Sequence, residues 1–258
     1  MILRRFAEAL KEQNWTTILV EFVLLVAGVF LGIQAANWNE ARRDHAQEAE
    51  FIGRLQRDFH AIDARLTRNL SRWQEKASSS IRLLADLEAF QQRGAWARPK
   101  GEILRDLENS MNGAIPAPRS ASYIELLSAG KLGLIRDTAL RDALLGYDTQ
   151  TGFTMKAYDV LVERTDPHMP TIIAHLELDP GIVDPNVVEQ NARSQNIDVW
   201  KDVDLAQLAA DPRLKVALNT FASASSNQLM VAMMQQQKAR AVMALLEPGA
   251  MSTEGNRP

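Results

Sequence analysis

The chain has 258 residues and no cysteine. Disulfide bonds and thiolate metal sites are therefore excluded. An excess of charge of one sign is also missing, because 29 lysines and arginines stand against 32 aspartates and glutamates. This balance lacks the basic footprint that is typical of nucleic-acid binding. We therefore expect no nucleic-acid partner.

The short motifs of common catalytic and cofactor sites are missing as well. The sequence contains no GxxxxGK[ST], GxGxxG, GxSxG or HExxH, and no histidine has a glutamate three residues before it, as di-iron helical bundles require. Asp44, His45 and Glu48 have a spacing that would let them share a metal on one helix face, but a solvated face is the favoured interpretation. We expect no metal and no cofactor.

The sequence also lacks the alternating pattern that is typical of β-strands. Val, Ile, Tyr and Thr never alternate with polar residues over the length of a strand, and helix-forming residues dominate. The expected fold class is all-α, with one N-terminal transmembrane helix that continues into a long-helix antiparallel bundle.

The transmembrane helix is predicted from the stretch between Trp15 and Trp38. Residues 16–36 are apolar or small except Glu21 and Gln34. At about 1.5 Å per residue the two indoles would lie about 34 Å apart, which matches a bilayer core of about 30 Å with its interfaces. A buried core helix would need a large domain on every side, and no convincing cleavage site supports a signal peptide. The lipid bilayer is therefore the first expected partner.

One face of this predicted helix has an unusual composition. At 100° per residue, it is formed by five residues: Glu21, Leu25, Gly28, Gly32 and Ala35. The two glycines form a GxxxG step, which allows close approach of a second helix, and a carboxylate within the membrane normally faces protein or water. This membrane stripe predicts contact with a second copy or with a membrane protein partner. The alternative stays open that Glu21 reaches back to the interface and that the glycine spacing is incidental.

Residues 1–14 are predicted to form an amphipathic helix in the headgroup layer, with Arg4, Arg5 and Lys11 on its polar side. A short basic segment before an uncleaved span favours a signal anchor with a cytoplasmic N-terminus and a periplasmic domain, although Arg42 and Arg43 argue for the opposite orientation. The expected location is the bacterial inner membrane, with a single pass.

Residues 39–247 are expected to form the helical bundle domain, and residues 248–258 a disordered tail. The first helix should run to Arg93, because 39–93 contain no proline and only one glycine. Its predicted inward residues are Ile52, Leu55, Phe59, Ile62, Leu66, Leu70, Trp73, Ile81, Leu84 and Leu87. A two-stranded coiled coil also predicts such a stripe, but the drift near Ser78–Ser80 favours a bundle.

A helix over 102–109 is followed by a helix, tight corner and helix. Ser122 and Glu125 have the spacing of a capping box, Gly130 can end the first helix in a left-handed cap, and Asp137 can cap a second helix that runs to Thr165. The predicted inward residues of this second helix are Leu140, Leu144, Tyr147, Met155, Tyr158 and Val162.

We call the charged and aromatic set at this turn the corner: Arg119, Tyr123, Glu125, Asp137 and Arg141. These side chains could bind a small anion or a partner helix through charge-assisted hydrogen bonds. An internal brace, in which each group caps or pairs locally, is the favoured interpretation.

Two segments resemble a family of bacterial single-span membrane proteins with no assigned function. The first is E-F-V-L-L-V-A-G-V-F-L-G-I-Q-A-A-N-W-N-E at 21–40, with the pattern E-x(6)-G-x(3)-G-x-Q-x(2)-NWNE, and the second lies at 123–147. The resemblance covers the first sixty or so residues and the corner well, and the C-terminal half poorly. It implies no activity; it implies that Glu21 and the corner belong to one type of protein.

In the last third, residues 179–202 are rich in Pro, Gly, Asn and Asp, and they are expected to form a mobile or functional loop with one turn of helix begun by Asp184 and Pro185. Asp211 and Pro212 are expected to start the last long helix. Its predicted inward residues are Leu214, Leu218, Phe221, Leu229, Met233 and Leu245. Its methionines are interpreted as core filling rather than as a ligand groove.

Two functions of different classes follow. The favoured one is a membrane-anchored helical interaction or sensory module. The alternative is a membrane-tethered enzyme of unrecognised type that uses the corner between 119 and 147. The module is favoured because no nucleophile, base and orienting group fall together at a recognisable spacing.

Overall fold

The computed structural model of the chain describes residues 15–194 and 199–247, and the predictions for 1–14 and 248–258 lie outside that part. The chain divides into two units, Met1–Ile52 and Gly53–Pro258, which we describe separately.

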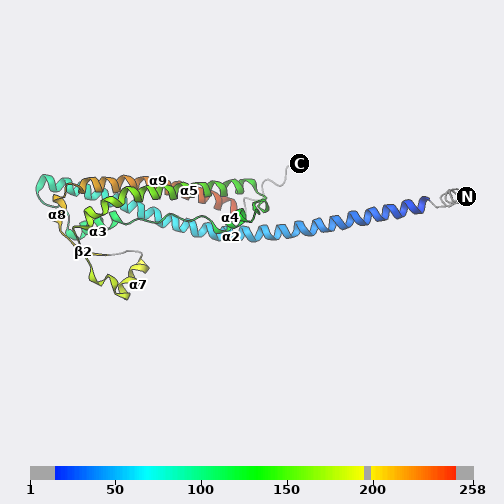
Figure 1. Ribbon diagram of the computed structural model, residues 1–258, viewed down its shortest axis with the longest axis horizontal. Coiled ribbons are helices and arrows are strands. Elements are labelled where there is room, and N and C mark those ends of the chain that lie inside the picture. Colours follow the sequence, from blue (N-terminus) through cyan, green and yellow to red (C-terminus); the bar gives the residue numbers. More distant parts are fainter. Residues whose placement is uncertain (1–14, 195–198, 248–258) are drawn as a thin grey trace. The chain divides into compact units, whose positions relative to one another are not determined.

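Most of the described residues lie in helices (Figure 1). In chain order they are α2 (Trp15–Arg93), α3 (Lys100–Met111), α4 (Ala121–Ser128), η1 (Leu132–Leu134), α5 (Thr138–Thr165), η2 (Asp166–His168), α6 (Met169–Ile173), β1 (Leu176–Leu178), η3 (Pro180–Val183), α7 (Pro185–Ser194), β2 (Trp200–Val203), α8 (Leu205–Ala210) and α9 (Leu214–Leu246). The expected predominance of helix is confirmed for this part of the chain.

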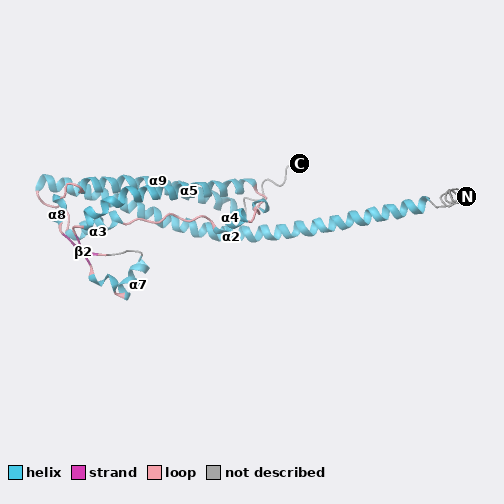
Figure 2. Ribbon diagram, in the orientation of Figure 1, coloured by secondary structure: helices cyan, strands magenta, loops and turns pink. Residues whose placement is uncertain are grey.

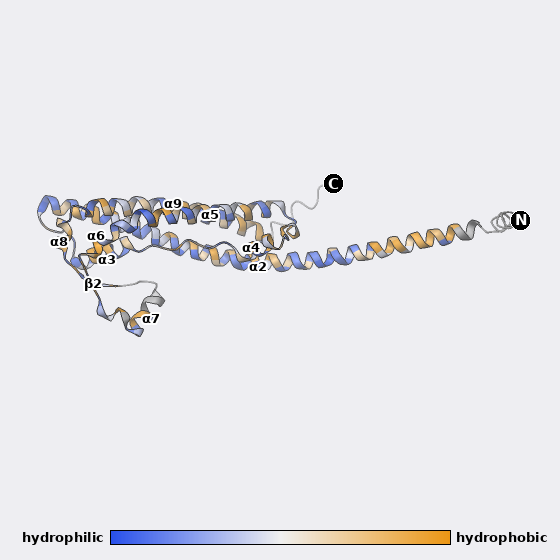
Figure 3. Cartoon of the chain, viewed as in Figure 1, coloured by the Kyte–Doolittle hydropathy of each residue, from blue (hydrophilic) through white to orange (hydrophobic). Residues whose placement is uncertain are grey.

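The first unit contributes the N-terminal part of α2. By length and composition this helix holds a candidate membrane span, with a mean hydropathy of 2.2 over an 18-residue window of which 0% is buried. Figure 3 shows the apolar residues gathered in this part of α2. The large apolar side chains from Leu19 to Ile33 are all exposed.

The second unit is organised around α5 and α9, which pack side by side along much of their length (Figure 1). Near the end of α2, an apolar cluster joins α2, α3, α6, β2, α8 and α9. Its buried members are Leu83, Leu87, Ile103, Leu107, Ile172, Val203, Leu208, Leu214, Leu218 and Phe221. Burial of this apolar area stabilises the packing at this end of the unit.

A second cluster lies around Trp73, where α2, α5, α9 and the loop after α3 meet. Trp73, Ala114 and Leu161 are buried there together with Ala224 and Ala232. The predicted stripe on α2 is largely confirmed, since Leu55, Phe59, Ile62 and Leu66 are also buried. Ile81 is a wrong assignment: it is 56% exposed, and Leu83 takes the inward position.

Two methionines that were predicted to face inward, one on α5 and one on α9, are exposed in the structure. Met155 and Met233 are 49% and 57% exposed, respectively. The buried positions instead include polar residues: Thr151, Thr154 and Thr165 on α5, and Ser225, Gln228, Gln235 and Gln236 on α9. A sequence pattern that places polar residues outside misses these positions. The three threonines donate to carbonyls of their own helix, and Gln235 and Gln236 donate to other helices.

A small antiparallel sheet departs from the expected all-α class (Figure 2). In it, β1 pairs with β2, with Leu176 opposite Val203. The backbone N–H groups of Val199 and Trp200 donate to Glu108 Oε1 at 3.2 and 3.1 Å, so a buried side chain of α3 fixes the start of β2. Three to four residues are too few to show a recognisable alternation in the sequence.

The predicted loop over 179–202 contains more structure than expected. Asp184 and Pro185 do begin a helix, but α7 has ten residues rather than one turn. A further helix, α8, is capped by Asp204, whose Oδ1 accepts from Ala206 and Gln207 N–H. The predicted start of the last helix is also wrong: Asp211 follows α8 as its C-cap, and α9 begins at Leu214.

Candidate functional site

The membrane stripe of Glu21, Leu25, Gly28, Gly32 and Ala35 is exposed along its whole length. A Cβ atom added to Gly28 or Gly32 would meet no atom within 4 Å. The surface of α2 is therefore open for the approach of another helix, which is the geometric condition for a GxxxG contact.

The corner begins with the cap of α4, and the predicted capping box of Ser122 and Glu125 does not form. Ser120 is the N-cap, and its Oγ accepts from the N–H of Tyr123 at 3.2 Å. Asp58 of α2 selects this start, because its Oδ2 accepts from Ser120 Oγ at 2.8 Å and from Ser122 N–H at 2.9 Å. The negative charge of the Asp58 carboxylate also interacts favourably with the positive N-terminal end of the α4 helix dipole.

Glu125 pairs with Arg54 of α2 through both carboxylate oxygens. The hydrogen bond from Arg54 lowers the pKa of Glu125 below its usual value. Because Glu125 is exposed, water screens this pair, and its contribution to stability is small. Its geometric effect is to fix the outer face of α4 against α2.

The turn after α4 forms as predicted. Gly130 has φ +66°, and the N–H groups of Gly130 and Lys131 donate to the carbonyls of Leu127 and Leu126, which is a Schellman motif. Asp137 caps α5 by accepting from the N–H of Leu140 at 3.1 Å.

Arg141 lies in the first turn of α5 and stabilises the segment that precedes this helix. It donates to the carbonyl of Ile135 at 2.6 Å and to Thr138 Oγ1 at 3.1 Å. The guanidinium therefore satisfies the backbone just before its own helix.

Arg119 and Tyr123 form a separate group with Asp148 of α5. Arg119 Nε lies 3.1 Å from Asp148 Oδ1. Tyr123 is buried, and burial together with the carboxylate of Asp148 raises its pKa, against the opposing effect of Arg119. Nearby, Tyr147 donates its hydroxyl to the carbonyl of Pro118 at 2.8 Å. These contacts hold the loop before α4 against α5.

The structure thus brings only two of the five corner residues together. Arg119 and Tyr123 share Asp148, whereas Glu125 pairs with α2, and Asp137 and Arg141 act within the turn. This geometry is that of a brace between α2, α4 and α5. Arg54, Asp58 and Asp148 complete it, and no local pattern identifies them, because their partners lie far away in sequence.

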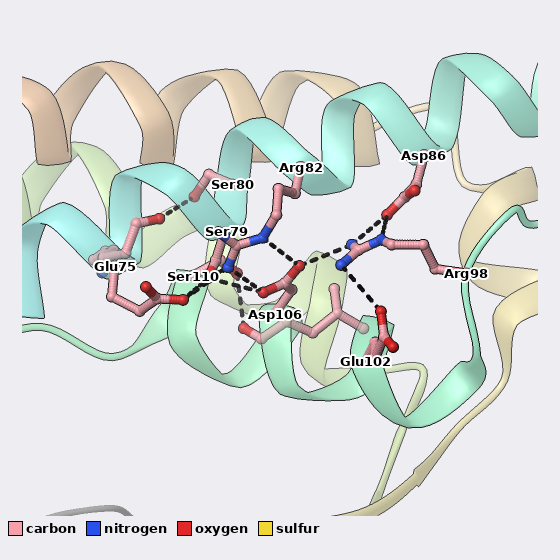
Figure 4. A network of polar contacts seen from close by, with 11 residues as sticks. Glu75, Ser79, Ser80, Arg82, Asp86, Arg98, Glu102, Asp106 and Ser110 are labelled. Atoms are coloured by element: carbon pink, nitrogen blue, oxygen red, sulfur yellow. Dashed lines mark hydrogen bonds and ion pairs between the residues drawn. The ribbon is translucent and has the colours of Figure 1, made fainter.

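The sequence pattern does not predict a charge network between α2 and α3, which Figure 4 shows. Asp106 lies at its centre and is almost fully buried. It accepts from Arg82 at 2.9 and 2.5 Å, from Arg98 at 2.8 Å and from Ser79 at 3.0 Å.

Three further carboxylates extend this network: Arg82 also donates to Glu75 at 2.7 Å, Arg98 also pairs with Asp86, and Arg98 Nη1 lies 3.9 Å from Glu102 Oε2. Burial opposes ionisation of Asp106, but the hydrogen bonds from Arg82, Arg98 and Ser79 outweigh it and hold the pKa of Asp106 below its usual value. The carboxylate therefore stays charged and links the two helices.

Near the small sheet, His175 Nε2 lies 3.4 Å from Asp211 Oδ2. The adjacent groove of about 470 Å³ is lined by this histidine and by Lys100, Glu177, Asp202, Asp204 and other residues. In the described ranges, no group of three or more His, Asp or Glu is arranged to hold a metal ion. Within the set of Asp44, His45 and Glu48, His45 Nδ1 lies 3.9 Å from Glu48 Oε2.

In comparisons with known proteins, no family model, no curated protein and no solved structure matches the chain. The resemblance of segments 21–40 and 123–147 to a single-span family therefore stays a prediction.

Proposed function

We propose that the chain is a membrane-anchored helical interaction module, with a single span in the bacterial inner membrane and residues 53–247 as an antiparallel bundle. The observation that carries this proposal is the apolar segment of α2, which combines a mean hydropathy of 2.2 with complete exposure. Such a surface is costly in water and stable in a bilayer.

The membrane stripe is the proposed contact surface for a second copy of the chain or for another single-span protein. The open space around Gly28 and Gly32 supports this part of the proposal. A carboxylate at Glu21 would then find a polar partner in the neighbouring helix rather than lipid.

Self-association is tested by Gly28→Leu and Gly32→Leu in the full chain, reconstituted in lipid vesicles and followed by energy transfer between labelled copies. The proposal expects the double variant to associate at least tenfold more weakly, because leucines keep the backbones apart. The matched control is Val29→Leu with Ile33→Leu, which has the same spacing on a different face. Equal association of both double variants and the unchanged chain would remove the dimer proposal.

Orientation is tested by labelling, and the absence of cysteine makes this direct. A single Ala241→Cys change introduces one exposed thiol on α9. If the domain is periplasmic, a membrane-impermeant maleimide labels it in intact spheroplasts. Labelling only after lysis would place the domain in the cytoplasm.

The enzyme alternative at the corner gains no support from the contacts. Its polar groups are held by separate partners on α2, on α5 and within the turn. We therefore propose a module and not a catalyst.

A further inference from the structure

A groove of about 320 Å³ opens beside α2, where the loop after α3 runs along that helix. Its lining residues are Arg65, Arg68, Asn69, Arg72, Gly113 and Ile115. The three arginines stand at positions i, i+3 and i+7, so they share one face of α2 and extend over about 10 Å of helix.

Two of these arginines carry charge that the described part of the chain does not neutralise. Arg65 and Arg68 have no hydrogen bond or ion pair among those residues, whereas Arg54, Arg82 and Arg98 each pair with a carboxylate. Arg68 is exposed and Arg65 is half-buried. The groove thus has an excess of positive charge, although the chain as a whole has a net charge of −3.

The walls of the groove are held in place. Asn69 is 6% exposed and donates its Nδ2–H to the carbonyl of Ile115 at 2.8 Å. At Gly113 an added Cβ would lie 2.7 Å from the ring of Trp73, so the loop lies against the indole where only glycine fits. The distance between the loop and α2, which carries the arginines, is therefore set before any ligand arrives, and this reduces the entropic cost of binding.

We propose that this groove binds the phosphate group of a small ligand, with Arg65 and Arg68 as the main donors and Arg72 at its edge. A phosphate has more acceptor oxygens than a carboxylate and can receive hydrogen bonds from two guanidinium groups at once. A groove of this volume admits a phosphate with a small organic group. The ligand is either a free phosphate compound or an anionic lipid headgroup, and the site does not depend on the function proposed above.

The test is calorimetric titration of inorganic pyrophosphate into the full chain in phosphatidylcholine nanodiscs. Arg65→Gln and Arg68→Gln should each raise the Kd about tenfold, which is the loss of one charge-assisted hydrogen bond. Arg57→Gln is the matched control, since Arg57 is an exposed arginine of α2 outside the groove. Neither groove substitution removes a hydrogen bond or an ion pair within the described chain, and unchanged circular dichroism is the check that each variant still folds.

Two further titrations define the ligand class. In nanodiscs that also contain phosphatidylglycerol, a weaker apparent affinity for pyrophosphate assigns the site to lipid headgroups, and an unchanged affinity assigns it to free phosphate compounds. Succinate should bind at least tenfold more weakly than pyrophosphate. The proposal is overturned if succinate binds equally well, if pyrophosphate shows no saturable binding, or if the Arg65→Gln, Arg68→Gln double variant keeps the Kd of the unchanged chain.

Discussion

Two glutamines on the inward face of α9 provide the sharpest test of the packing. Gln228 and Gln235 are 1% and 0% exposed and lie seven residues apart. Neither the Nε2 nor the Oε1 atom of Gln228 has a hydrogen-bond partner within the described chain. Nε2 of Gln235 has three acceptors nearby. The same substitution, Gln→Met, should therefore change stability in opposite directions at the two positions.

For Gln228→Met the free energy of unfolding should rise. The residues one turn before and after it, Ala224 and Ala232, belong to the apolar cluster around Trp73. A buried amide without partners costs about 1–3 kcal/mol, and methionine has a similar volume and flexibility without that cost. The expected gain is about 1–2 kcal/mol.

For Gln235→Met the free energy of unfolding should fall. Its Nε2 lies 3.0 Å from Thr151 Oγ1, 3.3 Å from the carbonyl of Ala117 and 3.4 Å from the Tyr147 hydroxyl. Two N–H groups can donate, and each bond contributes about 1 kcal/mol. The carbonyl of Ala117 would lose its donor, while removal of the unpartnered Oε1 of Gln235 offsets part of the loss. The expected net loss is about 1–2 kcal/mol.

The measurement is urea unfolding of the full chain in mild detergent, followed by far-ultraviolet circular dichroism. An unchanged m-value would show that each variant alters stability and not the extent of unfolding. The predicted difference between the two variants is about 2–4 kcal/mol. If both variants shift the midpoint in the same direction, the assignment of partners on this face of α9 is wrong.

Two further predictions concern titratable groups. Burial lowers the pKa of Lys76 to about 8, against the opposing effect of Asp166. Since an unfolded lysine keeps its proton to about pH 10.4, the unfolded state binds more protons between about pH 8 and 10, and the free energy of unfolding should rise there by about 2–3 kcal/mol. Lys76→Met should abolish this rise in denaturation curves measured across that window. Asp106→Ala should lower stability by about 2–4 kcal/mol, because Arg82 and Arg98 lose a common acceptor. This difference should shrink as the pH falls below about 4, where the unfolded carboxyl binds a proton first. The control is Glu163→Ala on α5, which removes an exposed carboxylate with no hydrogen bond or ion pair among the described residues and should change stability by less than about 0.5 kcal/mol.

Local signals in the sequence predict the parts of the fold that local physics decides. The extent of α2 to Arg93 follows from the absence of proline, and the end of α4 follows from Gly130, whose backbone adopts the positive φ that favours glycine. Asp137 caps α5 and Thr165 ends it, as the sequence predicts. In each case the deciding contacts lie within a few residues.

Distant contacts decide the features that the sequence does not predict. Ser120 and Ser122 are equally suitable caps, and the choice of Ser120 depends on Asp58, 62 residues away. Glu125 has the spacing for a capping box but is taken by Arg54, 71 residues away. The turn between α4 and α5 is therefore predictable from the sequence, whereas the partners of its charged residues are not.

The sequence pattern also fails to predict which residues of α5 and α9 are buried between the helices. Periodicity assigned Met155 and Met233 to the core, while polar residues occupy neighbouring inward positions. Thr151 and Thr154 donate to carbonyls one turn back in their own helix, which satisfies their hydroxyls without a distant partner. A buried threonine of this kind cannot be distinguished by pattern from a solvated one.

The polar residues of α9 also determine the register of the helices. Gln235 reaches Thr151 of α5, and Gln236 donates to Thr67 of α2 at 2.9 Å. Arg240 donates to Asp63 at 2.9 Å one turn further along α9. A shift of α9 by one turn, about 5.4 Å, would leave apolar side chains in apolar surroundings but would break all of these bonds together. Among the α9 side chains in these bonds, only Gln235 and Gln236 are buried, and each would cost about 1–3 kcal/mol without a partner. These two amides therefore favour one register where apolar packing alone would permit several.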